Sequence, residues 1–140
     1  MTQISPYLDA TEVTRFCSDD HFEVISYYAS HGLLLLKSKP TNTSGQCMHL
    51  LFQDVRAIEI RFWFDGLSVI ERDLDYLAQF ASKPTEMMEI GLKVYELRST
   101  AWRGYVVGGI FRSVEARPGK LYESPLIGEL PPIFLGQQTH

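Results

Sequence analysis

The sequence predicts a single α+β domain with a mainly antiparallel, curved β-sheet of about seven strands, two short helices and an extended C-terminal arm. Three observations lead to this fold class. Apolar residues alternate with polar ones in several stretches, which is the two-residue period of strands with one buried face. The segments between these stretches have hairpin length and show no βαβ rhythm. From residue 116 onward, prolines interrupt a segment that remains rich in apolar residues.

The central element is predicted to be a β-hairpin over residues 57–72. In its first half, the apolar residues alternate with Ala57, Glu59, Arg61 and Trp63, as in a strand with one buried face. Asp65-Gly66 follows, and this pair favours a type I′ turn because both central positions of such a turn need positive φ. The residues expected on the buried face are Ile58, Ile60, Phe62 and Phe64.

The chain before this hairpin is predicted to start with a short helix and a strand. Residues 9–12 have the spacing of a capping box, and Asp19-Asp20 is expected to end the helix because both side chains compete for backbone groups. Residues 22–30 alternate loosely and predict the strand. The apolar face of the predicted helix consists of Val13, Phe16 and Cys17.

The next two elements are predicted to be strands. Four consecutive leucines, Leu33–Leu36, indicate burial on both faces, and therefore a central strand with a helix over its second side. A buried helix is the competing interpretation, but Gly32 and Pro40 flank the run and favour a strand. Residues 47–55 alternate and predict a further strand.

The second half of the chain predicts one more helix and two long strands. Residues 74–81 carry an apolar stripe, with Asp73 as the expected N-cap. Residues 89–99 and 103–115 are strand-like. Gly108-Gly109 interrupts the second of these strands and predicts a kink or a close backbone approach.

The composition favours one domain, assigned to residues 1–135, with 136–140 as a frayed tail. A net charge of −4 argues against nonspecific binding to nucleic acid. The longest apolar run is too short to span a bilayer, and residues 1–10 lack the pattern of a secretory signal. The two cysteines cannot form a dense disulfide framework, so we expect reduced thiols in the cytoplasm.

One group of residues has the composition of a metal site. Its two pairs are spaced i, i+4 on the predicted helix and i, i+2 on a predicted strand, and together they would form a tetrahedral zinc set. Neither pair has the usual zinc-ribbon spacing, so two buried cysteines and two ordinary histidines are the preferred interpretation, and no metal or cofactor is predicted. The four residues are Cys17, His21, Cys47 and His49.

Catalytic motifs are not found in the sequence. It contains no G-x-S-x-G elbow, and neither cysteine lies in a family signature. Residues 104–109 lack the lysine and the strand–turn–helix context of a phosphate loop. Asp19-Asp20 is better explained as a solvated helix end than as an acid–base pair. No catalytic residue is predicted, and a non-enzymatic protein is favoured.

The outward face of the predicted hairpin is the best candidate for binding. It carries Glu59, Arg61 and Trp63, and tryptophan beside arginine is enriched at interaction hot spots. Trp102 and Arg103 repeat this composition at the tip of the last hairpin, where we expect them to face solvent. If a helix or the arm covers Trp63, that residue belongs to the core instead, and the sequence leaves this open.

These features predict a small cytoplasmic interaction domain. It would engage a protein partner, or a second copy of itself, through the sheet face around Trp63 and the hairpin tip at Trp102. In general type (small, acidic and strand-rich, with no visible active site) the chain is similar to bacterial toxin-immunity proteins and other small binding proteins.

The alternative is a small-molecule or enzymatic pocket inside the curved sheet. The Gly108-Gly109 kink would open its mouth, and the lining would come from Tyr95, Tyr105, His49 and Arg61. A deep cavity of at least a few hundred cubic ångströms that holds a histidine or carboxylate with a shifted pKa would favour the pocket. A filled interior with a flat, aromatic outer patch would favour the interaction domain.

Overall fold

The computed structural model describes residues 12–28, 30–40, 44–80, 91–119 and 124–126. These residues form a single antiparallel sheet of eight strands in the order β4-β7-β6-β5-β1-β2-β3-β8. The elements are β1 (Val13–Tyr28), β2 (Leu33–Ser38), β3 (Cys47–Gln53), β4 (Ala57–Glu59), β5 (Trp63–Arg72), the 3₁₀ helix η1 (Leu74–Gln79), β6 (Lys93–Arg98), β7 (Arg103–Gly108) and β8 (Ile110–Ala116). The fold is therefore mainly β.

The two predicted α-helices are wrong. Val13–Cys17 belongs to the long strand β1, where Phe16 packs against the core while Val13 and Cys17 are exposed, so the three do not form one buried face. Pairing with β5 outweighs the local pattern of so short a segment, because propensity is a weak prior. The second helix is only the 3₁₀ helix η1, and the side chain of Asp73 does not cap it. Residues 9–11 and 81 lie outside the described residues.

The predicted hairpin over residues 57–72 is also wrong, although both of its halves contain strands. β4 pairs with β7, whereas β5 pairs with β1 and β6. Asp65-Gly66 lies inside β5, where the pairing with β1 shifts register between Ser18 and His21. Gly66 has the positive φ that the sequence predicted, 74°, but it lies opposite a β-bulge of β1 and not in a turn.

The predictions for β2 and β3 are confirmed. All four leucines from Leu33 to Leu36 are buried, and β2 lies inside the sheet between β1 and β3. Their second side is not covered by a helix among the described residues. Leu126, from the short described part of the predicted arm, packs there against Leu33, Leu35 and Leu51. The remainder of that arm, including 136–140, lies outside the described residues.

A corner of the sheet forms at the predicted kink. Only Gly109 separates β7 from β8, yet β8 and the β4–β7 pair lie at opposite edges of the sheet order. The chain bends beside residues 54–56: Arg56 N donates to Val107 O (2.8 Å), and Gly109 N donates to Gln53 O (2.9 Å). A Cβ on Gly108 would lie 3.2 Å from Gln53 O, so this close approach favours glycine. The predicted kink is confirmed.

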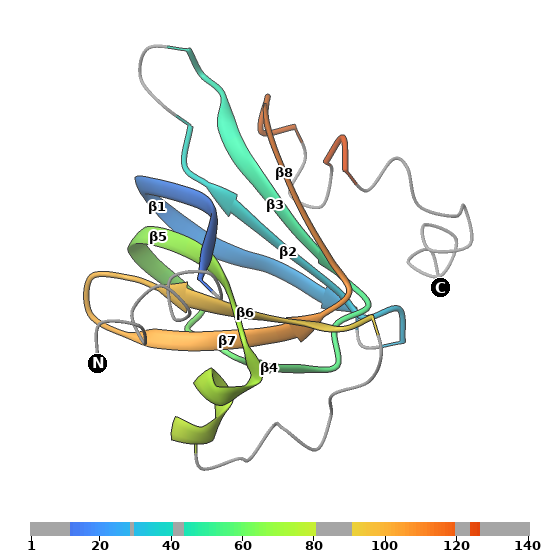
Figure 1. Cartoon of the computed structure of the whole chain (residues 1–140). Coiled ribbons are helices and arrows are strands. Elements are labelled where there is room, and N and C mark those ends of the chain that lie inside the picture. The colour runs from blue at the N-terminus through green and yellow to red at the C-terminus, as the bar shows by residue number, and fades with distance from the viewer. Residues whose placement is uncertain (1–11, 29, 41–43, 81–90, 120–123, 127–140) are drawn as a thin grey trace.

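The sheet is folded into two layers. Figure 1 shows β2, β3 and β8 in one layer and β6 and β7 in the other, with the two layers at an angle and converging where β7 leads into β8. The edge strands β4 and β8 do not pair with each other, so the sheet is not closed. Two layers joined by bent strands at the corners are a known way to pack β-sheets.

Most of the core lies between these layers. Its fully buried members include Phe22, Leu36, Phe52, Val69 and Leu97. A separate cluster on the outer face of β6 and β7 is covered by η1, through Tyr76 and Leu77. No helix in the described part of the chain has the length and apolarity to cross a membrane.

Candidate functional site

An exposed pair of aromatic side chains marks one end of the sheet. Phe62 is 72% exposed and Trp63 is 67% exposed, and with Arg61 they form what we call the aromatic tip. A hollow of about 310 Å³ lies against these three residues. The prediction that Phe62 is buried is wrong, because β4 ends at Glu59 and the alternation does not continue through the connection to β5.

The backbone of the aromatic tip is held by the sheet. Val24 N donates a hydrogen bond to Phe62 O (2.7 Å), and Trp63 pairs with Glu23 of β1. The next residue, Phe64, is buried in the core and stacks on Phe22. The tip therefore offers exposed side chains on a fixed backbone, which is favourable for binding because less conformational entropy is lost.

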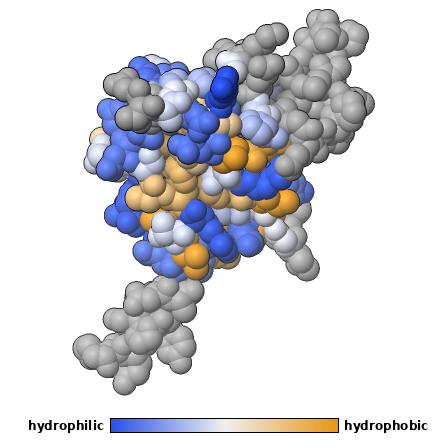
Figure 2. Space-filling model, turned by 90° about the horizontal axis from the view of Figure 1, so that it is seen from above, coloured by the Kyte–Doolittle hydropathy of each residue, from blue (hydrophilic) through white to orange (hydrophobic). Residues whose placement is uncertain are grey.

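The tip holds the two most exposed large hydrophobic side chains of the described residues. Among the described residues, the large hydrophobic side chains that are exposed are Val13, Tyr27, Phe62, Trp63, Leu74 and Ile110. Only Phe62 and Trp63 are neighbours in the chain. On the face that Figure 2 shows, apolar residues are interspersed with polar ones, as is normal for a protein surface.

The turn between β6 and β7 lies at the same end of the sheet. Trp102 is half-buried, and its ring meets that of Phe64 edge-on with centroids 4.9 Å apart. The prediction that Trp102 faces solvent is therefore wrong. Ser99 and Thr100 donate hydrogen bonds to Asp65 O, which attaches the turn to β5 two residues after Trp63.

The predicted interaction residues are thus brought to one region. Glu59, Arg61 and Arg103 are exposed there. Glu59 pairs with Tyr105, and its carbonyl oxygen lies so close to Gly104 that a Cβ on Gly104 would be 2.0 Å away. Five residues chosen from separate stretches of sequence lie around the β4–β5 connection and the β6–β7 turn.

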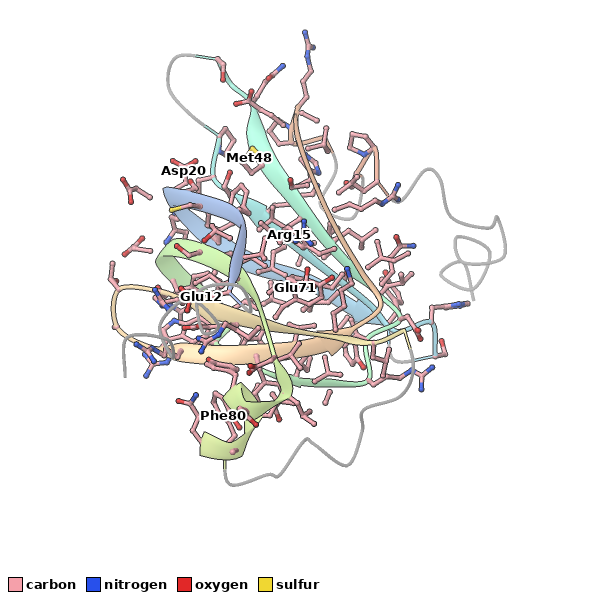
Figure 3. The ribbon with its side chains drawn as sticks, viewed as in Figure 1. Glu12, Arg15, Asp20, Met48, Glu71 and Phe80 are labelled. Carbon is pink, nitrogen blue, oxygen red and sulfur yellow. The ribbon has the colours of Figure 1, made fainter. Side chains whose placement is uncertain are left out.

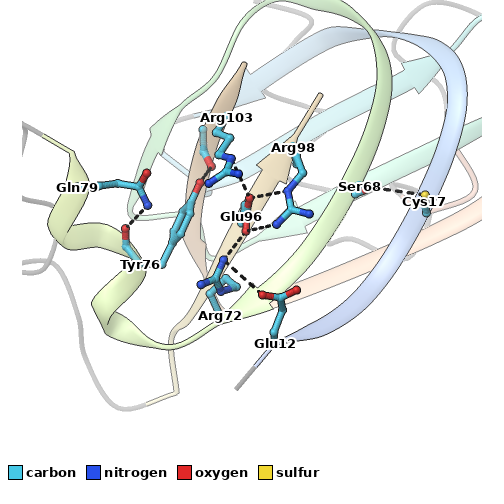
Figure 4. Close-up of polar contacts among 10 residues, drawn as sticks. Glu12, Cys17, Ser68, Arg72, Tyr76, Gln79, Glu96, Arg98 and Arg103 are labelled. Atoms are coloured by element: carbon cyan, nitrogen blue, oxygen red, sulfur yellow. Dashed lines mark hydrogen bonds and ion pairs between the residues drawn. The ribbon is translucent and has the colours of Figure 1, made fainter. Parts of the chain in front are cut away.

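A buried carboxylate organises the outer face beside this turn. Glu96 is fully buried and accepts hydrogen bonds from Arg72 Nη1 (2.6 Å) and from Arg98 Nε (2.9 Å) and Nη2 (3.3 Å). Arg103 Nε lies 3.7 Å from the same carboxylate. We call Arg72, Arg98 and Arg103 the arginine group; Figure 4 shows it converging on Glu96.

The arginine group keeps Glu96 ionised. Burial alone raises the pKa of Glu96, but the hydrogen bonds from Arg98 and Arg72 outweigh it, and the net pKa lies below the ordinary value. The guanidinium of Arg72 lies over the ring of Tyr76, 5.0 Å from its centroid. Burial raises the pKa of Tyr76, whose hydroxyl donates to Gly104 O (2.9 Å).

A polar pocket of about 250 Å³ opens between the two layers, on the inner side of the sheet. Arg15 donates to Glu71 Oε1 through Nε (2.9 Å) and Nη2 (2.6 Å), and Lys93 Nζ lies 3.7 Å from Glu71 Oε2. Figure 3 shows Arg15 and Glu71 in the space between β8 and β6. The lining residues are Arg15, Glu71, Lys93, Tyr95, Gly109, Ile110 and Phe111.

The pocket contains only part of the predicted lining. Tyr95 and the Gly108-Gly109 kink are at the predicted place, but the other three residues lie elsewhere. Tyr105 is buried under η1 against Phe80, and Arg61 belongs to the aromatic tip. His49 is fully buried, and its Nε2 donates to Arg117 O (3.1 Å).

The two cysteine–histidine pairs do not form a metal site. Within the described ranges, no group of three or more His, Cys, Asp or Glu side chains is arranged to hold a metal ion. Cys17 is exposed on β1, whereas Cys47 is buried beside His49 (Sγ to Nε2, 3.4 Å). Burial raises the pKa of the Cys47 thiol, which disfavours the reactive thiolate.

Glu96 and its partners Arg72 and Arg98 were not predicted from the sequence. A signal was present, because Glu96 interrupts an apolar strand and Arg98 follows two residues later on the same face. Arg72 reaches Glu96 from another strand, through a register that no local pattern encodes.

Comparison with protein-family models, curated proteins and solved structures finds no match to this chain.

Proposed function

We propose that the protein is a non-enzymatic interaction domain of the cytoplasm that binds a protein partner through the aromatic tip and the adjoining β6–β7 turn. The observation that carries this proposal is the exposure of Phe62 and Trp63, side by side, on a backbone fixed by the sheet. The free thiols of Cys17 and Cys47 support the proposed compartment.

The energetics of burial explain why such a pair favours a partner. Full burial of a phenylalanine-sized side chain stabilises a complex by about 1.5–3 kcal/mol relative to exposure. Tryptophan and arginine dominate the residues whose truncation weakens interfaces most. Arg61 lies between Glu59 and the two aromatic residues, so apolar and charged anchors are available at one place.

The test is affinity capture from an extract of the native host. The wild-type chain is compared with the F62A/W63A variant, and with L74A as a matched control, since Leu74 is also an exposed apolar residue but lies on η1. We expect a protein that the wild type and L74A retain and that F62A/W63A loses at least tenfold. Equal retention by F62A/W63A would contradict the proposal.

A second candidate function is small-molecule binding in the pocket between the layers. It is favoured by the volume of about 250 Å³ and by the Arg15–Glu71 pair next to Tyr95, whose pKa is raised by burial. Thermal denaturation with a panel of small carboxylates and amines tests this function. A ligand that stabilises the wild type but not R15A would support it; a panel without any such ligand would count against it.

A further inference from the structure

We propose that Arg98 and Arg103 bind carboxylate groups from an acidic segment of the partner protein. This inference rests on the proposed function and specifies the chemistry of the partner. It starts from the pairing of Glu96. The guanidiniums of Arg72 and Arg98 already donate hydrogen bonds to both oxygens of this carboxylate.

Arg103 is therefore not needed to satisfy Glu96. Its Nε lies 3.7 Å from Glu96 Oε2, which is too long for a hydrogen bond. The Arg103 side chain is 56% exposed and that of Arg98 is 41% exposed, so both guanidiniums present N–H donors to solvent. Pairing with Glu96 does not use these exposed N–H donors, so a purely structural role does not explain them.

The charges of the arginine group and its carboxylate partners also favour an acidic ligand. The arginine group carries three positive charges, and among the described residues the carboxylates within ion-pair distance are Glu96 and Glu12, which lies 3.7 Å from Arg72. Counted over the residues that the structure describes, the cluster keeps one positive charge in excess, within a chain whose net charge is −4. This local excess fits an anionic group of a partner.

The guanidiniums are also held in place before any partner binds. Glu96 holds Arg98 through two nitrogens, and the ring of Tyr76 supports Arg72. A fixed guanidinium loses less entropy when it pairs, and its planar fork matches a carboxylate in two parallel hydrogen bonds. The buried Glu96 thus orients the donors that a ligand would use.

The position of these arginines relates them to the aromatic tip. The β6–β7 turn lies between Arg98 and Arg103, and Trp102 in that turn packs on Phe64, the residue after Trp63. A hollow of about 190 Å³ adjoins Arg98, but Asp19 also lines it and would repel a carboxylate. We therefore expect the acidic segment to lie over Arg103 and the adjacent side of Arg98.

The test uses a fluorescently labelled hexaglutamate peptide, with hexaglutamine as the uncharged control. Fluorescence anisotropy should show binding to the wild type at low salt and at least a tenfold weaker affinity for R98Q/R103Q. R56Q is the matched variant, because Arg56 is 42% exposed and also pairs with a carboxylate, that of Asp54. It should bind like the wild type. R103Q alone leaves every hydrogen bond to Glu96 in place and keeps the test valid if the double variant does not fold.

Equal affinity of R103Q and the wild type for hexaglutamate would overturn the inference. The inference would also be overturned if inorganic phosphate bound as tightly as hexaglutamate per unit of charge. The site would then select a free anion and not an acidic segment. The proposed function is contradicted by a different result, namely that F62A/W63A still retains the captured partner. If F62A/W63A loses the partner but R98Q/R103Q retains it, only the inference about the acidic segment is contradicted.

Discussion

Two carboxylates on neighbouring strands, Glu71 and Glu96, show how the same chemistry serves different purposes on the two faces of one sheet. Glu71 pairs in the ladder with Tyr95, and Ile70 pairs with Glu96, so the two carboxylates point to opposite faces. Both are met by cations. Glu96 is fully buried and is paired with the arginine group, whereas Glu71 meets Arg15 and Lys93 in an open pocket.

The difference shows that burial, not pairing, decides how much each carboxylate contributes to stability. An exposed ion pair gains little because water and salt screen it. A buried carboxylate depends on its partners, and losing them leaves an uncompensated charge. We therefore expect Glu96 to act as a structural anchor and Glu71 as an adjustable group at a pocket.

The largest expected effect is that of E96Q. The substitution leaves three arginines close together without their central charge, so the free energy of unfolding should fall by about 3 kcal/mol, the lower end for a broken buried pair because Arg72 and Arg98 remain partly exposed. Urea denaturation at pH 7 measures it. An unchanged midpoint would show that Glu96 is not an anchor.

The same carboxylate should give stability a dependence on acid pH. Its folded pKa lies below the ordinary value of 4.5, so its contribution is complete above pH 4.5 and is lost as the pH falls through the folded pKa. The wild type should lose stability more steeply than E96Q in this range. Parallel curves of midpoint against pH for the two proteins would argue that Glu96 does not titrate as described.

The smallest effect is expected for E71Q. Arg15 and Lys93 are both largely exposed, so the pair with Glu71 is screened and its loss should lower stability less than E96Q does. Denaturation in low and high salt provides the check, because the difference between E71Q and the wild type should shrink as salt rises. If E71Q lowered the free energy of unfolding as much as E96Q does, the proposed difference between the carboxylates on the two faces would be wrong.

Elements that local interactions decide were predicted correctly from the sequence. Elements that pairing between distant strands decides were not. The run Leu33–Leu36 and the Gly108-Gly109 kink were predictable because burial on both faces and a close backbone approach leave local signatures. Asp65-Gly66 also has a local signature, positive φ, but a turn and a bulge share it. Only pairing with β1 distinguishes the two, and that pairing is not local.

The same distinction between local and non-local interactions applies to the residues of the site. Arg61, Trp63 and Arg103 could be chosen from composition, and the fold of the sheet then brings them to one end. The exposure of Phe62 could not be predicted, because it depends on where β4 stops pairing with β7. The contact of Arg72 with Glu96 depends on the β5–β6 register.

The most direct test of the proposed interaction domain is photo-crosslinking in the native host. The photoreactive residue benzoylphenylalanine replaces Trp63 in one variant and, as a control, Ile110, which is 51% exposed at the pocket between the layers. We predict a covalent adduct with a protein partner from position 63 and none from position 110. An adduct from position 110 with none from position 63 would contradict the account.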